Sequence, residues 1–279
     1  ATGKTYEQLY DEIKAKFPLR SQRAETSGGP PPNLLNIYKL TLADPEADVL
    51  RICREYEKDS NVEYAQPNYN HRVLFSPNDP FYNSSGSWGQ PSTRGDYQDL
   101  WGLKKIQSGA AWDITQGEGT IVAVVDTGVD YNHPDLAANI WVNTDEIPGN
   151  GIDDDGNYYV DDIRGWNFTV PNGNNNPMDN YGHGTHVSGT IAAVGNNSIG
   201  IVGVAPKTKI MPVKGLDDTG WGSDGWLADA IEYALINGAD IISNSWGCWA
   251  PCPYDPTLER AVWSANFLGV VTVFAAGNS

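Results

Sequence analysis

The stretch that decides the fold is GHGTHVSGT, residues 182–190, which holds two of the four histidines in this 279-residue chain. From His183 onward, Val187, Thr190, Ile191 and Val194 recur at helical spacing. The pattern predicts a loop that leads into a helix carrying both imidazoles in its first turn. Flanking glycines let another segment approach closely, so a histidine here suits chemistry better than packing.

Apolar β-branched runs alternate with helical segments on both sides of this stretch. In chain order they are TIVAVVD (120–126), HVSGTIAAVG (186–195), KIMPVKGL (209–216), DGWLADAIEYALING (224–238), DIISNS (240–245), PTLERAVWSANFLG (256–269) and VVTVFAAG (270–277). This alternation predicts an α/β fold, a doubly wound and mostly parallel sheet with helices on both faces. Ligands of such sheets bind at the carboxyl ends of the strands.

The chain divides into three parts by composition. Residues 1–75 are predicted to form a small α+β domain, with helices over 4–17 and from about Asp44 to residue 59, and strands over 34–42 and 62–69. Residues 76–102 are rich in Pro, Gly, Ser, Asn and Asp, which indicates a linker or surface loop. Residues 103–279 form the α/β body.

Negative charge is concentrated in that body. The net charge is −17, and residues 1–75 carry 10 Lys and Arg against 11 Asp and Glu, so the excess lies beyond residue 75. Such a surface repels nucleic acid and anionic membranes and attracts cations. No run of 18 apolar residues is present, which disfavours a membrane span. We therefore expect neither a nucleic-acid nor a membrane partner.

Three cysteines constrain the redox state. Cys248 and Cys252 form C-W-A-P-C, which predicts a small disulfide loop of an exported protein, with two reduced thiols as the alternative. A zinc site is disfavoured because no second Cys/His pair accompanies them. Cys53 is isolated and is expected to be a small buried apolar residue.

Asp126 ends the apolar strand of residues 120–125, and Thr127 and Gly128 turn the chain directly after it. A buried carboxylate needs partners, because leaving it unpaired is costly. The simpler interpretation is a structural Asp that binds loop amides. His183 is the other candidate partner, since an Asp that orients a His forms the acid arm of a nucleophilic triad.

Four motifs resemble the subtilisin family of serine endopeptidases, over a similarity that runs from about Trp101 to the last residue. They are VAVVDTGVD around Asp126, GHGTHVSGT, SNSWG (243–247) and FAAGN (274–278). The resemblance implies a subtilisin-like α/β fold and peptide-bond hydrolysis. It implies that Asp126 is the catalytic acid, that His183 is the general base, and that Asn278 donates to the oxyanion. His186 would be structural and packed into the helix.

The resemblance also implies a substrate cleft. Gly220-Trp221-Gly222 and Ser245-Trp246-Gly247 align with the two strands that bind an extended peptide by backbone pairing. Trp246 and Leu227 would line an apolar outer subsite, with ordinary core packing as the alternative. A metal hydrolase built on His183 and His186 is disfavoured, because Gly184 stands where the H-E-x-x-H pattern has its Glu.

The family's nucleophilic serine lies in a G-T-S-M-A segment well after the oxyanion Asn, and this sequence contains no such segment. We expect the chain to carry the acid, the base and the oxyanion Asn without the nucleophile, and to be inactive alone. An N-terminal fragment of a split enzyme, a truncated chain and a naturally inactive, peptide-binding or inhibitory relative would each explain this. We favour a fragment completed by a C-terminal fragment that supplies the serine.

The acidic run NGIDDDGNYYVDD, residues 150–162, predicts a structural calcium site. Oxygen donors alternate around Gly156, and hard oxygen ligands at this density fit calcium. The expected ligands are Asp153, Asp155, Asn157, the Tyr159 carbonyl and Asp162, with Asp161 as the alternative closing ligand. A merely solvated acidic loop is the competing interpretation. The resemblance supports calcium, since several exported members of the family carry similar insertions.

The N-terminal domain resembles the family's propeptides, which assist folding and then inhibit the enzyme in its cleft. By that resemblance the chain is an unprocessed zymogen with its own propeptide as intramolecular inhibitor, and the processing point lies between about His71 and Asp79. Its partners would be protein or peptide substrates. We expect it to be secreted and extracellular.

Overall fold

The computed structural model describes residues 38–69, 75–85, 98–248 and 254–278. The chain forms two compact units, Ala1–Arg72 and Val73–Ser279. The predicted helix over 4–17 lies outside the described residues. Cys252 does as well, so the Cys248–Cys252 disulfide stays a prediction.

The described part of the first unit contains one helix, α3 (Val49–Tyr56). It begins later than the sequence predicted because the Asp48 side chain accepts a hydrogen bond from Arg51 N at 2.9 Å and caps it there. The Asp44 carboxylate instead accepts from Glu46 N in a turn. Cys53 is half-buried and α3 has no buried residue, so the prediction of a buried Cys53 was wrong.

The predicted strands of this unit are absent from its described residues. Residues 38–42 and 62–69 have no regular secondary structure. Pro67 cannot donate to a strand ladder, and Tyr38 and Leu40 are exposed rather than packed on a second layer. An alternating pattern alone does not produce a strand when no neighbouring strand completes the hydrogen bonds.

The second unit is built on a parallel sheet of five strands in the order β2-β3-β1-β4-β5. The strands are β1 (Ile121–Asp126), β2 (Trp166–Asn167), β3 (Lys209–Lys214), β4 (Ile241–Asn244) and β5 (Val271–Phe274), and every pairing is parallel. β1 lies in the middle, between β3 and β4. The predicted α/β fold is confirmed.

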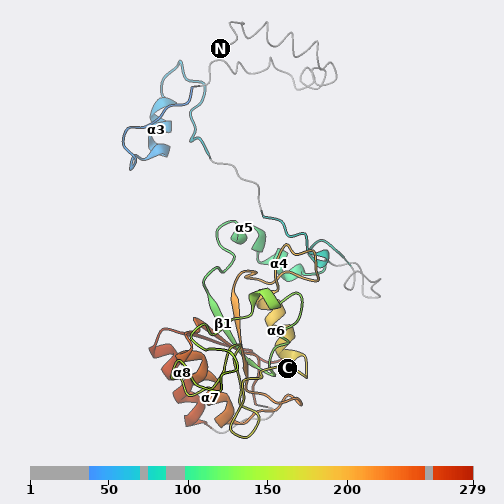
Figure 1. Ribbon diagram of the computed structural model, residues 1–279. Coiled ribbons are helices and arrows are strands. Elements are labelled where there is room, and N and C mark those ends of the chain that lie inside the picture. The colour runs from blue at the N-terminus through green and yellow to red at the C-terminus, as the bar shows by residue number, and fades with distance from the viewer. Residues whose placement is uncertain (1–37, 70–74, 86–97, 249–253, 279) are drawn as a thin grey trace. The chain divides into compact units, whose positions relative to one another are not determined.

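Helices cover both faces of this sheet, as the side chains of β1 show. Ala123 and Val125 belong to the core shared with α7 (Asp224–Ile236) and α8 (Pro256–Phe267). Val122 and Val124 point to the opposite face, where they pack with residues of α6 (His183–Ala192). In Figure 1, α7 and α8 lie together on one side of β1 and α6 lies on the other. A strand buried on both faces explains the continuous apolar run.

A smaller hydrophobic core is formed mainly by the segments that precede the sheet in sequence. It is formed by Tyr82 in the short helix η2 (Pro80–Tyr82), Leu103 in α4 (Trp101–Lys105) and Trp112 in α5 (Ser108–Trp112), together with Val202. The Tyr82 and Trp112 rings have centroids 5.7 Å apart. The described parts of 76–102 therefore pack onto the unit, although their composition predicted a surface loop.

Two buried carboxylates hold the loop after α6. Asp79 Oδ2 accepts from Asn196 N at 2.7 Å, and Asp135 Oδ2 accepts from Ile201 N at 3.0 Å. Both side chains are at most 3% exposed. The C-terminal end of α6 is thus fixed to the segments before and after β1.

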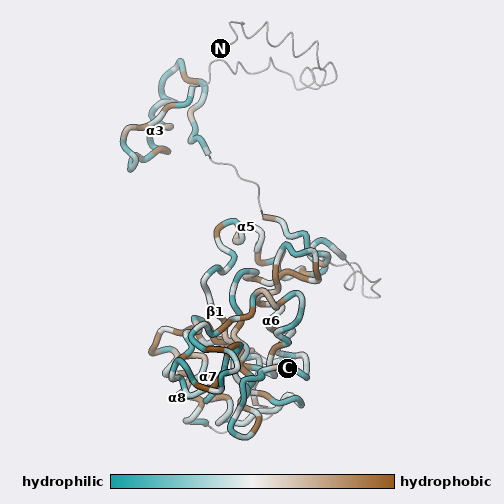
Figure 2. The backbone as a smooth tube through the Cα atoms, in the orientation of Figure 1, coloured by the Kyte–Doolittle hydropathy of each residue, from teal (hydrophilic) through white to brown (hydrophobic). Residues whose placement is uncertain are grey.

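The far edge of the sheet is apolar and exposed. In β5, Val271, Val273 and Phe274 are 55%, 50% and 44% exposed. In α8, Trp263 and Phe267 stack with ring centroids 5.2 Å apart and are also exposed. By contrast, the hydrophobic segments in Figure 2 gather around β1 and α7 in the interior. Within the described ranges, no helix is long and apolar enough to cross a membrane.

Candidate active site

β1 delivers Asp126 to the carboxyl edge of the sheet. The residue is the last of the strand and has no exposed surface. Its Oδ1 accepts from Thr127 N at 2.7 Å, while Oδ2 is buried and meets no donor within the described parts of the chain. Burial raises the pKa of Asp126 above its ordinary value, and the hydrogen bond to His183 opposes that rise.

α6 delivers His183, which is its first residue, as the helical spacing predicted. Gly182 precedes it with a φ of 103°, a backbone conformation that favours glycine. His183 Nδ1 lies 2.7 Å from Asp126 Oδ1, although the two residues are 57 positions apart. The His183 side chain is 42% exposed and the Asp126 side chain is fully buried, so the pair leaves the other face of the imidazole open.

The approach of α6 to β1 depends on Gly184. A Cβ at this position would lie 2.1 Å from the Gly128 carbonyl oxygen and 3.0 Å from the Asp126 Cβ. Any side chain would therefore separate the helix start from the strand end. This glycine lets the two backbones come close enough for His183 to reach Asp126.

This arrangement has a defined chemical capacity. A buried carboxylate that binds Nδ1 selects the imidazole tautomer whose Nε2 can accept a proton, and it stabilises the imidazolium that forms. His186, in the same turn, is exposed rather than packed. The expectation that His186 packs into the helix was wrong for this chain, because its side chain lies on the outer face of α6.

Asn278 lies after β5, two strands away from β1 in the sheet. It is exposed, and its side chain has no hydrogen bond to another described residue. Asn278 and Asp126 therefore share the carboxyl edge of the sheet, but the structure does not bring them into contact.

The two expected substrate segments follow the strands that flank β1. Residues 220–222 come after β3 and residues 245–247 after β4, and neither segment is a strand. Trp221 is 64% exposed, and its backbone N–H donates to Asp217 Oδ1 at 3.1 Å. Both segments therefore follow strands that neighbour the one carrying Asp126.

Trp246 and Leu227 have packing roles. The Trp246 Nε1–H donates to the Val125 carbonyl oxygen at 3.0 Å, and its ring lies 5.5 Å from that of Phe274. Leu227 is 5% exposed within the main core. For Leu227 the core interpretation therefore holds and the outer subsite does not.

The acidic loop gathers a different set of side chains from the predicted one. Glu146, Asp155 and Asp162, which we call the acidic group, offer carboxylate oxygens within 4.8 Å of one another. Glu146 was missed, although it is the nearest Glu on the N-terminal side of the run. Both oxygens of the Glu146 carboxylate bind the loop backbone: Oε1 accepts from Asp154 N at 2.8 Å, and Oε2 accepts from Asp161 N at 2.9 Å.

The other predicted ligands have different partners. Both Asp153 oxygens accept backbone N–H groups, from Gly156 at 2.7 Å and from Tyr158 at 2.8 Å. Asn157 contacts the group through its amide, 3.2 Å from Asp155 Oδ2 and 3.1 Å from Asp162 Oδ2. The Tyr159 ring packs at 4.8 Å from the Tyr233 ring. Asp153 therefore supports the loop rather than joining the acidic group.

Asp162 is the most deeply buried member of the group, and Glu146 is buried as well. It has no exposed surface, and Tyr233 donates its hydroxyl to Oδ2 at 2.5 Å. Burial raises the pKa of Asp162, and hydrogen bonds from Tyr233, Asn143 and Asn157 oppose the rise. Three crowded carboxylates, two of them buried, form a set whose ionised state a bound cation would favour.

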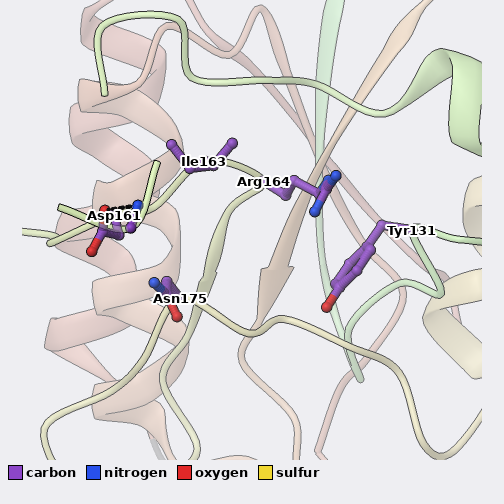
Figure 3. Close-up of a pocket in the computed structure, with 6 residues that line it drawn as sticks. Tyr131, Asp161, Ile163, Arg164 and Asn175 are labelled. Carbon is purple, nitrogen blue, oxygen red and sulfur yellow. Dashed lines mark hydrogen bonds between the residues drawn. The ribbon is translucent and has the colours of Figure 1, made fainter. Parts of the chain in front are cut away.

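A cavity of about 170 Å³ lies beside this loop and apart from His183. Tyr131, Asp161, Ile163, Arg164 and Asn175 line it (Figure 3), with Gly149. The Arg164 guanidinium carbon lies 5.3 Å from the centre of the Tyr131 ring, and both Asp161 oxygens accept loop N–H groups. Neither His183 nor Asp126 lines this cavity, and no member of the acidic group does.

Comparison with known proteins agrees with this geometry. The sequence model described as "Subtilase family" matches residues 117–279. Over 219 residues the chain is 40% identical to the thermophilic serine proteinase of Bacillus sp. (strain AK1), which covers 78% of this chain and 44% of that protein. Over 205 residues it is 37% identical to thermitase of Thermoactinomyces vulgaris, which covers 74% and 59%.

A third relative is Subtilisin-like protease 1 of Plasmodium berghei (strain Anka), 41% identical over 206 residues, or 72% of this chain and 34% of that protein. The chain thus spans 34–59% of the length of these relatives. The family match covers more than half of the chain and includes the strand that carries Asp126 and the helix that carries His183. This chain belongs to the subtilase family.

Proposed function

We propose that this chain is part of a serine endopeptidase of the subtilisin type, which cleaves peptide bonds in extended protein substrates. The observation that carries the proposal is the 2.7 Å contact between His183 Nδ1 and the buried Asp126 carboxylate. The names of the similar proteins, a serine proteinase and a subtilisin-like protease, support it.

In this mechanism His183 is the proton carrier. Its Nε2 takes the proton of the attacking serine hydroxyl and later returns a proton to the leaving amine. Asp126 holds the tautomer and stabilises the imidazolium. The Asn278 amide donates to the oxyanion, where such a donor contributes about 3 to 4 kcal/mol in subtilisin, a member of the same family.

The nucleophile is the missing component, since the sequence holds no G-T-S-M-A segment. We propose that further polypeptide supplies the serine and covers the exposed edge formed by β5 and α8. Parallel strands are normally buried on both faces, whereas Val271 and Val273 are half exposed here. The chain alone is then expected to be inactive.

For substrate binding, we propose that Gly220–Gly222 and Ser245–Gly247 pair with the backbone of an extended peptide. The two segments follow the strands on either side of β1 and are not themselves paired as strands. Backbone pairing tolerates many sequences, which suits an endopeptidase of broad protein substrates.

Structural calcium fits the acidic group. Glu146, Asp155 and Asp162 supply oxygen ligands, with the Asn157 side chain and the Tyr159 carbonyl in the same loop. Bound calcium would neutralise crowded carboxylates and tie the loop to α7 through the Tyr233 hydroxyl. Asp153 is left out of the proposed ligands because it lies outside the group of carboxylates whose oxygens come within 4.8 Å of one another.

We propose that the first unit is the propeptide and intramolecular inhibitor, and that the protein is a secreted zymogen. The separation of Ala1–Arg72 from Val73–Ser279 as compact units is compatible with release of the first unit by proteolysis. A disulfide between Cys248 and Cys252 would suit the same oxidising compartment.

Hydrolysis of an unfolded protein substrate tests the proposal. The native protein, isolated with any polypeptide bound to this chain and with its first unit released, should cleave casein, and the His183→Ala protein treated in the same way should not. Equal cleavage by the two proteins, or none by either, would contradict the proposed activity. The non-catalytic, peptide-binding alternative predicts binding of unfolded substrate without cleavage.

A further inference from the structure

The segment before α6 contains a carboxylate that the mechanism above leaves unused. Asp179 lies four residues before His183 and is half-buried. Its two oxygens accept five hydrogen bonds, which come from both sides of the active-site pair. These donors lie on two backbone segments, the one after β1 and the one that begins α6.

Asp179 Oδ1 binds the segment after β1 and the residues just before α6. It accepts from the Thr127 hydroxyl at 2.9 Å, from Tyr181 N at 2.9 Å and from Gly182 N at 2.8 Å. Thr127 is 1% exposed and directly follows Asp126. One oxygen therefore fixes the strand end to the residue that precedes His183.

Asp179 Oδ2 binds the first turn of α6. It accepts from Thr185 N at 2.9 Å and from the Thr185 hydroxyl at 2.7 Å. The Thr185 hydroxyl oxygen accepts in turn from Asp130 N at 2.9 Å. The second oxygen therefore links the helix start to the loop after Asp126 a second time.

The Thr127 hydroxyl connects these contacts to the catalytic pair. Its oxygen accepts from Gly184 N at 3.0 Å while its hydrogen goes to Asp179, and Thr127 N donates to Asp126 Oδ1. Hydrogen bonds thus connect Asp179 through Thr127 to Gly184, the residue after His183, and to the Asp126 carboxylate. Charged acceptors make such bonds shorter and stronger than neutral ones.

We propose that Asp179 is a positioning residue that, through the Thr127 hydroxyl and the first turn of α6, holds His183 Nδ1 against Asp126 Oδ1. The inference rests on the proposed function for its catalytic meaning, but the contact it concerns can be measured without turnover. Hydrogen bonds to Asp179 lower its pKa although burial opposes them, so the carboxylate is the acceptor at neutral pH.

An amide cannot replace this carboxylate. Asn at position 179 offers one acceptor oxygen, and its NH₂ group would face either Thr127, Tyr181 and Gly182 or the two donors of Thr185. Asp179→Asn therefore loses one side of the connection. Thr127→Val is nearly isosteric and removes only the hydroxyl, whereas Thr127→Ser keeps it.

The test measures the proton on His183 Nδ1 by NMR in the 279-residue chain with ¹⁵N-labelled histidine, assigned by its loss in His183→Ala. Asp179→Asn and Thr127→Val should each speed its exchange with water at least 10-fold. Thr127→Ser should stay within twofold of the parent.

Asp135→Asn is the matched control, since Asp135 is a buried carboxylate that holds the loop at the other end of α6. It should lower the melting temperature and leave the His183 proton within twofold. If Asp179→Asn does not fold, comparison of Thr127→Val with Thr127→Ser tests the proposal.

Unchanged exchange in folded Asp179→Asn and Thr127→Val proteins would overturn the proposal, as would equal acceleration by Asp135→Asn. Failure of the native protein, isolated with any polypeptide bound to this chain, to cleave casein would contradict the proposed function and leave this result unaffected. The two ideas therefore fail separately.

Discussion

The His183–Asp126 pair and the acidic group differ in how the chain brings their members together. The pair joins residues 57 positions apart, supplied by the end of β1 and the start of α6. The acidic group comes from one loop between Glu146 and Asp162. The expected contact of the distant pair is present in the structure, whereas the sequence prediction of the local group left out Glu146. Support by regular elements, rather than closeness in sequence, decides how well a site can be inferred.

The largest expected effect separates the two regions by activity. In the native protein, His183→Ala should lower kcat by about 10⁴-fold or more, the magnitude found when a triad member is removed from subtilisin-type enzymes. Asp155→Asn, in the acidic group, should lower kcat less than tenfold at saturating calcium. Steady-state kinetics on a peptide substrate check both values. A loss of similar size in the two variants would mean that the acidic group takes part in the chemistry.

The next effect concerns stability, and here substitution in the acidic group should matter more than substitution in the His183–Asp126 pair. Removing calcium with a chelator should lower the melting temperature by roughly 5–10 °C, the shift expected for a ligand bound well above its Kd. Asp155→Asn should raise, at least tenfold, the calcium concentration needed for half of this stabilisation. Asp154→Asn is the control, because that neighbouring carboxylate lies outside the acidic group. If scanning calorimetry shows no change in melting temperature on calcium titration, the proposed calcium site is wrong.

Gly184→Ala tests the backbone contact behind the pair. The added methyl would meet the Gly128 carbonyl oxygen at 2.1 Å, so the variant should lose about 1–3 kcal/mol of unfolding free energy. Gly225→Ala in α7 is the control, since no atom lies within 4 Å of its Cβ position, and it should gain up to about 1 kcal/mol. Urea unfolding gives both values. Equal stability of the two variants would show that α6 can move away from β1 freely.

The smallest effect is a gain in stability on substitution of Asp126. Burial raises the pKa of Asp126, so its ionised form is less favourable in the folded than in the unfolded chain. This penalty is absent at pH values below the ordinary pKa of an aspartate, grows as the pH rises, and is complete above the raised pKa. Asp126→Asn should therefore unfold at slightly higher urea than the parent at pH 7 and show no advantage at pH 3. A lower midpoint at pH 7 would contradict this sign.

The sheet and the pair were predictable because their signals are periodic. The run 120–126 is buried on both faces, and the helical spacing after His183 set the start of α6. Parallel strands end at one edge, so Asp126, the segment after β3 and the segment after β4 had to meet there. Motif resemblance added the roles of these residues but was not needed for their position.

The acidic group was harder because loop dihedral angles decide it. Tyr158 and Asp161 have φ angles of 79° and 55°, which non-glycine residues seldom adopt, and these turns direct Asp153 to the backbone and Asp162 to the interior. The contribution of Glu146 depends on three backbone N–H groups that only the folded loop presents. Alternation in sequence could indicate oxygen donors but not their directions.

The first unit was mispredicted for a related reason. Its alternating segments over 38–42 and 62–69 are not strands, since no neighbouring strand completes their hydrogen bonds within the described residues. Both Asp44 and Asp48 could cap a helix in sequence, and only the Asp48 side chain accepts the capping hydrogen bond, from Arg51 N. Local patterns suggested the element types, and the missing tertiary partners decided which of them formed.

The most direct measurement is the rate at which a fluorophosphonate labels serine in the native protein, with intact-mass measurement of every polypeptide present. We expect stoichiometric labelling of one serine outside the 279 residues. We also expect His183→Ala to slow the labelling at least 1,000-fold, because in the proposed mechanism the imidazole held by Asp126 is the base that activates the hydroxyl. Absence of labelling in the folded protein, or the same labelling rate in His183→Ala, would contradict it.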